Sequence, residues 1–341
     1  MQSNDRYIRH EILEEIGPAG QRRISAASVL LVGCGALGSS QAQMLARAGV
    51  GRLRVVDRDL VEVTNLQRQI LFDEEDAAAL LPKAVAAQRK LSRINSEIEI
   101  DARVADVNAG NLESLLAGCD LVLDACDNLE TRYLVNDACV KAGVPWVYGG
   151  VVGTSGMVMA VRPGDGPCLR CLFPELPPPG AVVSCEVVGV LNAAPVVIGA
   201  LQAVEALKLI AGGARGSNGV LTLDLWRHSF QKVALARDER CPCCSQRRFE
   251  FLEAPRPELA RTIGCDAVQL FPCGEDRPSL PALAERLAGQ GRVTGNEHLL
   301  RFAAGQHTLL VFADGRVVVK GTDEVEVARQ LCSRFLTAPH G

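Results

Sequence analysis

The sequence lacks a strong charge of either sign, because its 341 residues carry a formal net charge of −4. A chain that attracts nucleic acid or a membrane surface electrostatically usually has a clear excess of basic residues. We therefore expect neither partner, and any docking must depend on local groups. The proportions of apolar (48%) and charged (22%) residues are typical of a soluble globular protein, and the length suffices for a sizeable core.

A long uninterrupted apolar run is also missing. The most apolar stretch, residues 187–211, is broken by Asn192, Gln202, Glu205 and Lys208. Such interruptions favour a buried helix over a membrane span. The first residues are polar and lack the charged-then-apolar pattern of a signal peptide. We expect a cytoplasmic protein with reduced cysteines.

Histidine is scarce, whereas cysteine is abundant. The five histidines show no ligand-like spacing, and several of the 13 cysteines lie singly in apolar runs, as core-filling thiols do. Four others form two Cys-x-x-Cys pairs, Cys168/Cys171 and Cys241/Cys244, which together offer the four ligands of a closed, structural zinc site. The alternative is two unrelated or redox-active pairs. Cys243 is an extra thiol that could compete for the metal.

The apolar pattern predicts strands that alternate with helices over the first 150 residues. After a helical arm at 1–26, we expect strands at 28–32, 53–56, 97–103, 121–125 and 145–148, and helices at 39–48, 83–95 and 128–142. This alternation predicts an α/β fold with a doubly wound, mostly parallel, Rossmann-like sheet. Antiparallel strands at 157–161 and 219–225 should extend it, with a proline-rich exposed loop at 174–180 between them and a helix at 195–211.

A second domain is expected at the C-terminus. Prolines mark a linker near residues 250–260, so we expect domains at 1–255 and 261–341. The second should be a small α+β module that begins with a strand after residue 261. Helices at 280–289 and 324–336 and strands at 292–294, 299–302, 308–312 and 316–320 should follow. Asp314-Gly315 predicts a hairpin turn between the last two strands.

A glycine-rich turn follows the first strand. Gly33, Gly35 and Gly38 have the Gly-x-Gly-x-x-Gly spacing that lets backbone approach a phosphate at a helix N-terminus. Asp57 lies 19 residues beyond Gly38, about where an acid grips ribose hydroxyls. The motif indicates a nucleotide without saying which, since an NAD-dependent dehydrogenase would show it too.

Polar residues that follow the second and fourth strands help to indicate which nucleotide is bound. Asn65 and Arg68 could reach phosphate oxygens, and Lys83 could supply a cation from a helix start. Asp127, beside Asn128, follows a strand and could hold Mg²⁺. Taken singly, these residues also fit a solvated loop, a surface lysine and a helix N-cap.

Eight motifs together resemble the ThiF/MoeB/HesA family, bacterial relatives of ubiquitin-activating enzymes. They are VGCGALGS, VVDRDLVEVTNLQRQ, PK, DACDN, CLRC, SCEVVGVL, LQAVEALK and CPCC, in the family's order and at about its spacing over residues 5–250. The resemblance implies binding of ATP and Mg²⁺, and adenylation of the C-terminal Gly-Gly of a ubiquitin-like sulfur carrier with release of pyrophosphate. Residues 1–255 would then be the adenylation domain.

The resemblance also implies roles for individual residues. Those implied to contact ATP or its metal are Gly33, Gly35, Ala36, Gly38, Asp57, Asp59, Thr64, Asn65, Leu66, Gln67, Arg68, Lys83, Asp127 and Asn128. Arg9 resembles an arginine that reaches the phosphates from the partner subunit of a homodimer. Arg9, Arg68, Lys83 and Mg²⁺ would offset the repulsion between a carboxylate and an α-phosphate. No general base is needed, because the attacking carboxylate is already ionised.

Cys185 follows the proline-rich stretch, within a crossover loop expected at about 174–188. Its position resembles that of a family cysteine that takes the activated carboxylate or forms an acyl-persulfide link. The alternative is adenylation alone, with Cys185 as a bystander.

The sequence thus predicts an ATP- and Mg²⁺-dependent adenylyltransferase for sulfur transfer in thiamin-type or molybdopterin-type cofactor synthesis. The alternatives are an NAD-dependent oxidoreductase on the same fold and a non-catalytic scaffold that uses its tail as a docking module.

Overall fold

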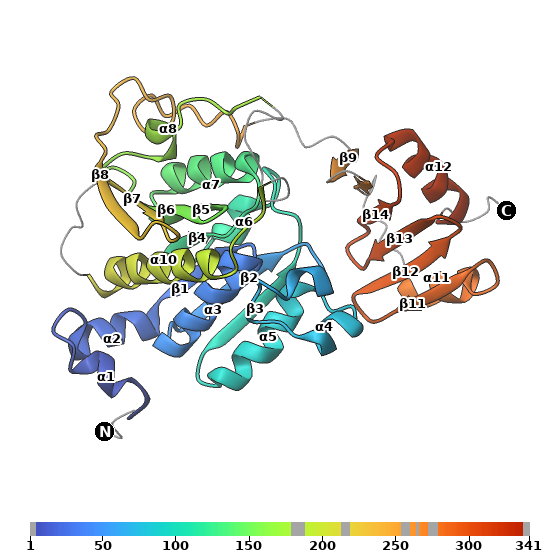
Figure 1. Cartoon of the computed structure of the whole chain (residues 1–341), viewed down its shortest axis with the longest axis horizontal. Helices are drawn as coiled ribbons and strands as arrows, with labels where there is room; N and C mark the ends of the chain where they lie inside the picture. The colour runs from blue at the N-terminus through green and yellow to red at the C-terminus, as the bar shows by residue number, and fades with distance from the viewer. Residues whose placement is uncertain are drawn as a thin grey trace. The chain divides into compact units, whose positions relative to one another are not determined.

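The computed structural model describes residues 5–178, 188–212, 219–253, 260–263, 266–271 and 279–336. The chain divides into two compact units, residues 1–255 and residues 256–341, which are described separately. Figure 1 shows the first unit in blue to yellow and the second in orange to red.

The first unit is built on an eight-stranded sheet in the order β3-β2-β1-β4-β5-β6-β7-β8. The first five strands in this order, from β3 through β2, β1 and β4 to β5, pair in parallel. The last three, β6, β7 and β8, extend the sheet with antiparallel pairs. The predicted fold class is therefore confirmed. The strands are β1 (Ser28–Val32), β2 (Arg52–Asp57), β3 (Glu99–Val104), β4 (Leu121–Asp124), β5 (Trp146–Val152), β6 (Ser155–Val161), β7 (Gly219–Asp224) and β8 (Ser229–Ala234).

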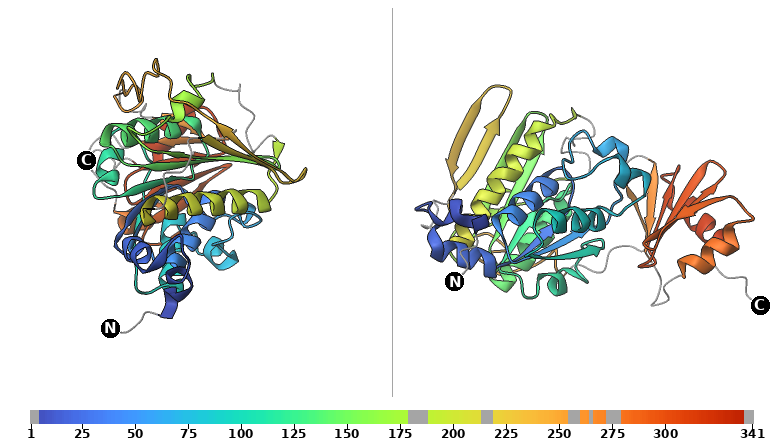
Figure 2. Two further views of the ribbon diagram at one scale, coloured as in Figure 1. Left: turned by 90° about the vertical axis from the view of Figure 1, so that its left-hand side faces the viewer. Right: turned by 90° about the horizontal axis from the view of Figure 1, so that it is seen from below.

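Helices cover both faces of this sheet. One core packs α3, α5 and α10 against it, and a second core packs α6, α7 and α8 against the other face. Figure 1 shows α7 and α10 on opposite sides, and Figure 2 gives two further views. The helices are η1 (Asp5–Tyr7), α1 (Ile8–Glu11), α2 (Gly17–Ala26), α3 (Ala36–Ala48), η2 (Val63–Asn65), α4 (Glu74–Ala78), α5 (Lys83–Ile94), α6 (Leu112–Leu116), α7 (Leu129–Ala142), α8 (Leu169–Leu172) and α10 (Ala193–Ala211).

Among the described residues, α10 is the one helix long and apolar enough to cross a membrane by length and composition. It packs instead on α3, β5 and β6 through a face that contains the buried residues Ile198 and Gln202. Val204 is 46% exposed, so α10 is buried on one side and open on another. The expected buried helix is present, with one uncovered apolar stripe.

The second unit contains a six-stranded antiparallel sheet in the order β11-β12-β13-β14-β10-β9. Its helices, α11 (Leu280–Leu287) and α12 (Val325–Phe335), pack with the sheet around one apolar core. The Asp314-Gly315 turn joins β13 to β14 as predicted, with Gly315 at φ +90°. The strands are β9 (Ala260–Ile263), β10 (Ala267–Leu270), β11 (Arg292–Gly295), β12 (Leu299–Ala304), β13 (His307–Phe312) and β14 (Val317–Lys320).

Strand β8 was not predicted. It forms the edge of the first sheet, and all of its residues after Ser229 are exposed. A strand that buries neither face has no apolar alternation to reveal it. The residues 179–187, 213–218 and 254–259 lie outside the described part of the chain, as do most of the expected crossover loop and linker.

Candidate functional site

The glycine turn lies where β1 and β4 separate, at the switch point of the sheet. Gly33 has φ +92°, and a Cβ there would overlap the carbonyl of Ala125 beyond β4. A Cβ on Gly38 would overlap the carbonyl of Gly33. At Gly35, in contrast, the nearest atom to such a Cβ is 3.7 Å away. The outer glycines are therefore required for packing, and the middle one leaves open space before α3 for a phosphate.

Asp57, at the end of β2, fastens this turn. One carboxylate oxygen accepts the Cys34 N–H at 2.6 Å and the other accepts the Asp59 N–H at 2.7 Å. Burial raises the pKa of Asp57, and the positive charge of Lys83 opposes that shift. Each oxygen retains a lone pair for a further donor, such as a ribose hydroxyl.

Lys83 is buried, at 5% exposure, so the surface-lysine alternative is wrong. Its Nζ lies 2.9 Å from the Asp59 carboxylate, and its N–H donates to the Asp59 carbonyl. Burial acts to lower the pKa of Lys83, but the charges of Asp59, Asp57 and Asp127 outweigh it and leave the pKa raised. Lys83 is thus a fixed, permanently charged cation beside the glycine turn.

Asp127 and Asn128 follow β4, and their side chains have different contacts. Asn128 is the N-cap of α7, because its Oδ1 accepts the Thr131 N–H at 2.8 Å. The helix-cap alternative therefore applies to Asn128, whereas Asp127 is exposed and accepts a hydrogen bond from the Asn128 amide at 3.1 Å. Its charge helps to raise the pKa of both Arg58 and Lys83, so Asp127 lies near enough to act on the same cations.

The 64–68 segment forms a short turn around η2. Leu66 packs against the first core and anchors the turn, while Thr64 and Gln67 are exposed. Arg68 folds back, with Nη1 donating to the Thr64 carbonyl at 3.0 Å. The turn thus presents polar side chains after β2. Ala36 is the first residue of α3, directly after the glycine turn.

Arg9 is not brought to this place. Its neighbour Tyr7 packs on Gly49 at the far end of α3, and the Tyr7 hydroxyl accepts from Asn95 at 2.8 Å. Helix α3 has 13 residues, so the two ends are about 20 Å apart. Arg9 is exposed and lies at the edge where the strands begin, opposite the glycine turn.

Four charged residues near the site were missed in the sequence. Arg58 donates to Asp106 at 2.8 Å beyond the ends of β2 and β3. Arg132, on α7, lies 3.1 Å from Asp124 at the end of β4. Both aspartates lie at or just beyond the carboxyl end of a strand, as Asp57 does, and that position was the available signal.

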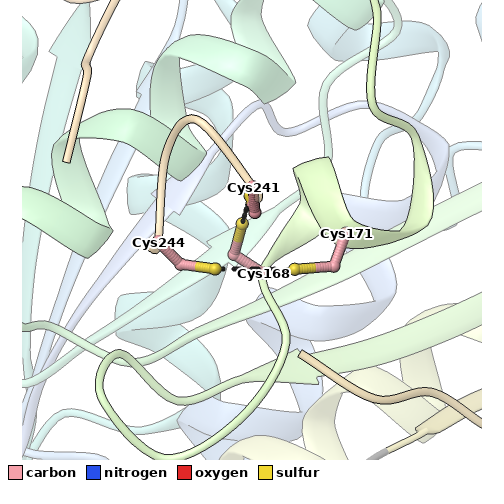
Figure 3. A group of neighbouring side chains, drawn as sticks. All are labelled: Cys168, Cys171, Cys241 and Cys244. Atoms are coloured by element: carbon pink, nitrogen blue, oxygen red, sulfur yellow. Dashed lines mark hydrogen bonds between the residues drawn. The ribbon is translucent and has the colours of Figure 1, made fainter. Parts of the chain in front are cut away.

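The four paired cysteines converge at a different place, beside α7 and α8. Their Sγ atoms all lie within 4.8 Å of one another, with Cys168 and Cys241 3.6 Å apart and Cys171 and Cys244 3.5 Å apart (Figure 3). A tetrahedron with Zn–S bonds of about 2.3 Å requires sulfur separations of about 3.8 Å. The cluster therefore fits a zinc ion.

Cys243 is not a member of this cluster. It is buried, and its Sγ accepts from the Asn136 amide at 3.1 Å. A backbone donor supports one of the four sulfurs, since the Asp238 N–H lies 3.5 Å from Cys171 Sγ. Hydrogen bonds within the cluster lower the pKa of Cys241 and raise that of Cys168, so the four thiols share their protons unevenly. A bound metal would require all four as thiolates.

Four further cysteines divide into two groups. Cys185, together with Cys265 and Cys273, lies outside the described residues. Cys332 lies in the second unit, where burial raises the pKa of its thiol to about 12. A thiol with so high a pKa is unreactive, which agrees with a packing role.

Comparison with known proteins places the chain in a family. A sequence model described as "ThiF family" matches residues 7–243. The chain is 38% identical to the "Sulfur carrier protein ThiS adenylyltransferase" of Bacillus subtilis, over 97% of this chain and 99% of that protein. It is 46% identical to the "Sulfur carrier protein adenylyltransferase" of Thermus thermophilus, over 70% and 90% of the two chains. The crystal structure of E. coli MccB shares the fold, with a TM-score of 0.61, 24% identity and coverage of 71% and 73%. The chain therefore belongs to the ThiF family.

Proposed function

We propose that the chain is an adenylyltransferase that uses ATP to activate the C-terminal glycine of a ubiquitin-like sulfur carrier for cofactor biosynthesis. The observation that carries this proposal is the meeting of the glycine turn, Asp57, Lys83 and Asp127 at one edge of the sheet. The names of the two adenylyltransferases above support the same activity. Family membership also favours ATP over the dinucleotide of an oxidoreductase.

The geometry suits attack of one anion on another. The open side of Gly35 and the start of α3 accept phosphate oxygens, and Asp57 accepts ribose hydroxyls. Lys83 supplies positive charge that remains at every physiological pH. When bound by Asp127, Mg²⁺ would neutralise further phosphate charge. The carrier carboxylate then attacks the α-phosphorus, pyrophosphate leaves, and no proton has to be removed.

The cysteine cluster has a structural role in this proposal. Four sulfur ligands fill a tetrahedral zinc site and leave no position for a substrate. The site joins α8 and its N-cap to the segment after β8, and each close sulfur pair is separated by 73 residues in the chain. Zinc held by Cys168, Cys171, Cys241 and Cys244 would therefore fasten the antiparallel extension of the sheet.

The site becomes complete only in a homodimer. Arg9 lies between apolar side chains that solvent would otherwise meet, because Ile8 is 40%, Ile12 66% and Leu13 46% exposed. Helix α2 links this arm to α10, whose Val204 is also exposed. A second copy that covers this surface would bury the apolar groups and bring Arg9 to the phosphates of its partner.

Exchange of labelled pyrophosphate into ATP tests the adenylation step. We expect exchange that requires Mg²⁺ and a carrier that ends in Gly-Gly, and none with the same carrier lacking its last glycine. Carriers of the thiamin and molybdopterin types can be compared directly. ATP binding without exchange, for every such carrier, would overturn the proposal. In this proposal Cys185 acts after adenylation. We then expect the wild type to form a covalent adduct with the carrier, and Cys185→Ser to lose this adduct but keep pyrophosphate exchange.

A further inference from the structure

A partly buried arginine, with 12% of its side chain exposed, lies close to the proposed metal ligand. Arg132 lies one turn into α7, and its Nη2 donates to the carbonyls of Cys126, at 2.7 Å, and Gly149, at 3.0 Å. Its Nε is 3.1 Å from the carboxylate of Asp124, and its guanidinium lies 5.2 Å from the centre of the Tyr148 ring. The arginine therefore bridges the loop after β4 to the neighbouring strand β5.

Asp124 holds the same loop from the other side. It is fully buried, and its Oδ1 accepts the Cys126 N–H at 2.8 Å. Its carbonyl accepts from the amides of Gln41, at 3.1 Å, and Gln202, at 2.8 Å, so the end of β4 is tied to α3 and α10. Cys126 is consequently fixed at its N–H by Asp124 and at its carbonyl by Arg132.

The next two residues are Asp127 and Asn128. Asn128 is anchored in turn by its hydrogen bond to the Thr131 N–H. Asp127 is therefore exposed between two neighbours that hydrogen bonds hold in place, so its position depends on both sets of bonds. Residues 126–128 thus form a short arch that is held at both ends. Loss of the hydrogen bond to the Cys126 carbonyl would release one end of this arch.

We propose that Arg132 is a positioning residue that, through the Cys126 carbonyl, holds Asp127 where it binds the metal of Mg·ATP. The inference rests on the proposed function. A displacement of about 1 Å at a reacting centre can reduce a rate about 100-fold. Arg132 need not touch the nucleotide to have such an effect.

A double variant separates positioning from folding. Arg132→Met alone would leave the Asp124 charge buried without its partner, which destabilises a protein strongly. Asp124→Asn/Arg132→Met removes both charges and keeps an oxygen that accepts the Cys126 N–H. Methionine cannot donate to the Cys126 and Gly149 carbonyls, so the loop after β4 loses both hydrogen bonds. No unpaired charge is left buried, because Asn replaces Asp124.

We expect the double variant to melt close to the wild-type temperature. Its kcat for pyrophosphate exchange should fall about 100-fold, and half-saturation should need about tenfold more Mg²⁺. KM for ATP should change less, because the glycine turn and Asp57 are untouched. Arg132→Lys should recover part of the rate, since its ammonium can reach one carbonyl and still pair with Asp124.

The chain offers a matched control in the same sheet. Arg54 is buried, pairs with Asp101 at 2.9 Å and donates to the carbonyls of Leu115 and Ala117. Its position is three residues before the end of β2, away from the arch. Arg54→Met/Asp101→Asn should therefore keep the wild-type Mg²⁺ dependence and exchange rate.

Two results would overturn the inference: a stable Asp124→Asn/Arg132→Met variant with wild-type kcat and Mg²⁺ dependence, or the same losses in the Arg54 control. Failure of the proposed function itself looks different, because the wild type would then bind nucleotide without exchange. In that case the Mg²⁺ dependence of binding of a non-hydrolysable ATP analogue takes the place of the assay. An equal dependence in wild type and double variant would again exclude positioning by Arg132.

Discussion

Charged residues lie both near the beginnings of the strands of the first sheet and at their carboxyl ends, which we call the two edges here. The two groups of charged residues differ in what they contact. Toward the edge where β2 and β3 begin, Asp101 lies 2.9 Å from both Arg52 and Arg54 and 2.6 Å from Arg103, so its charge is satisfied within the chain. At the carboxyl edge, Asp127 is exposed and faces the cations that a nucleotide would need. The edge of the sheet on which a charge lies thus indicates its role better than its burial does.

The largest effect should come from removing Asp127. We expect Asp127→Ala to lose pyrophosphate exchange by about 100-fold or more, because a ligand for the metal on the phosphates is lost. The melting temperature should stay within about 2 °C of wild type, since an exposed side chain contributes little to stability. Exchange at the wild-type rate would remove Asp127 from the site.

Asp101→Ala is the control for this variant, and it should show the reverse pattern. Three arginines would lose their shared partner, so we expect a lower melting temperature with an exchange rate near that of wild type. If both variants lost activity equally, the distinction between the two edges would fail.

The zinc prediction extends the comparison to a third place, where no substrate is involved. Metal analysis should find about one zinc per chain. We expect chelation, or Cys168→Ser, to lower the melting temperature by about 10 °C or more, because structural zinc supplies folding free energy. Cys243→Ser is the control, since that sulfur lies outside the cluster. A zinc-free protein with wild-type stability would exclude the site.

Arg9 tests the comparison further, because we propose a functional role for this cation although it lies away from the glycine turn of its own chain. Mixing Arg9→Ala protein with Asp127→Ala protein should restore activity if the site is shared. With random pairing, about a quarter of the sites would have both residues intact. The measurement is exchange after subunit exchange has been verified, and no recovery would show that each chain works alone.

The sequence predicted the elements whose pattern is local. The alternating strands, the glycine turn, Asp57 and the paired cysteines follow from periodicity and spacing, and they are present as expected. Arg132 and Asp124 could not be assigned, because their partners lie on other strands and helices. Arg9 lies away from the glycine turn of its own chain, so the role that the sequence resemblance implied for it would require the proposed dimer. Lys83 could be recognised as a buried cation only in three dimensions.

The smallest expected effect is on how the free energy of unfolding depends on pH, and it concerns Asp101 and its arginine partners. Burial acts to raise the pKa of Asp101, but hydrogen bonds from Arg54 and Arg103 outweigh it and leave the pKa lowered. A carboxyl whose pKa is lower in the folded state stabilises it above the unfolded pKa of about 4, and this contribution is lost as the pH falls through the folded value.

Asp101→Asn should therefore lower the free energy of unfolding most near neutral pH, and the difference from wild type should shrink below about pH 4. Tryptophan fluorescence during urea unfolding measures this cleanly, because both tryptophans, Trp146 and Trp226, lie in the first unit. Asp127→Asn is the control, and we expect this exposed residue to change stability little at any pH. A difference for Asp101→Asn that stays constant down to pH 3 would mean that the arginines stabilise the edge through packing and not through charge.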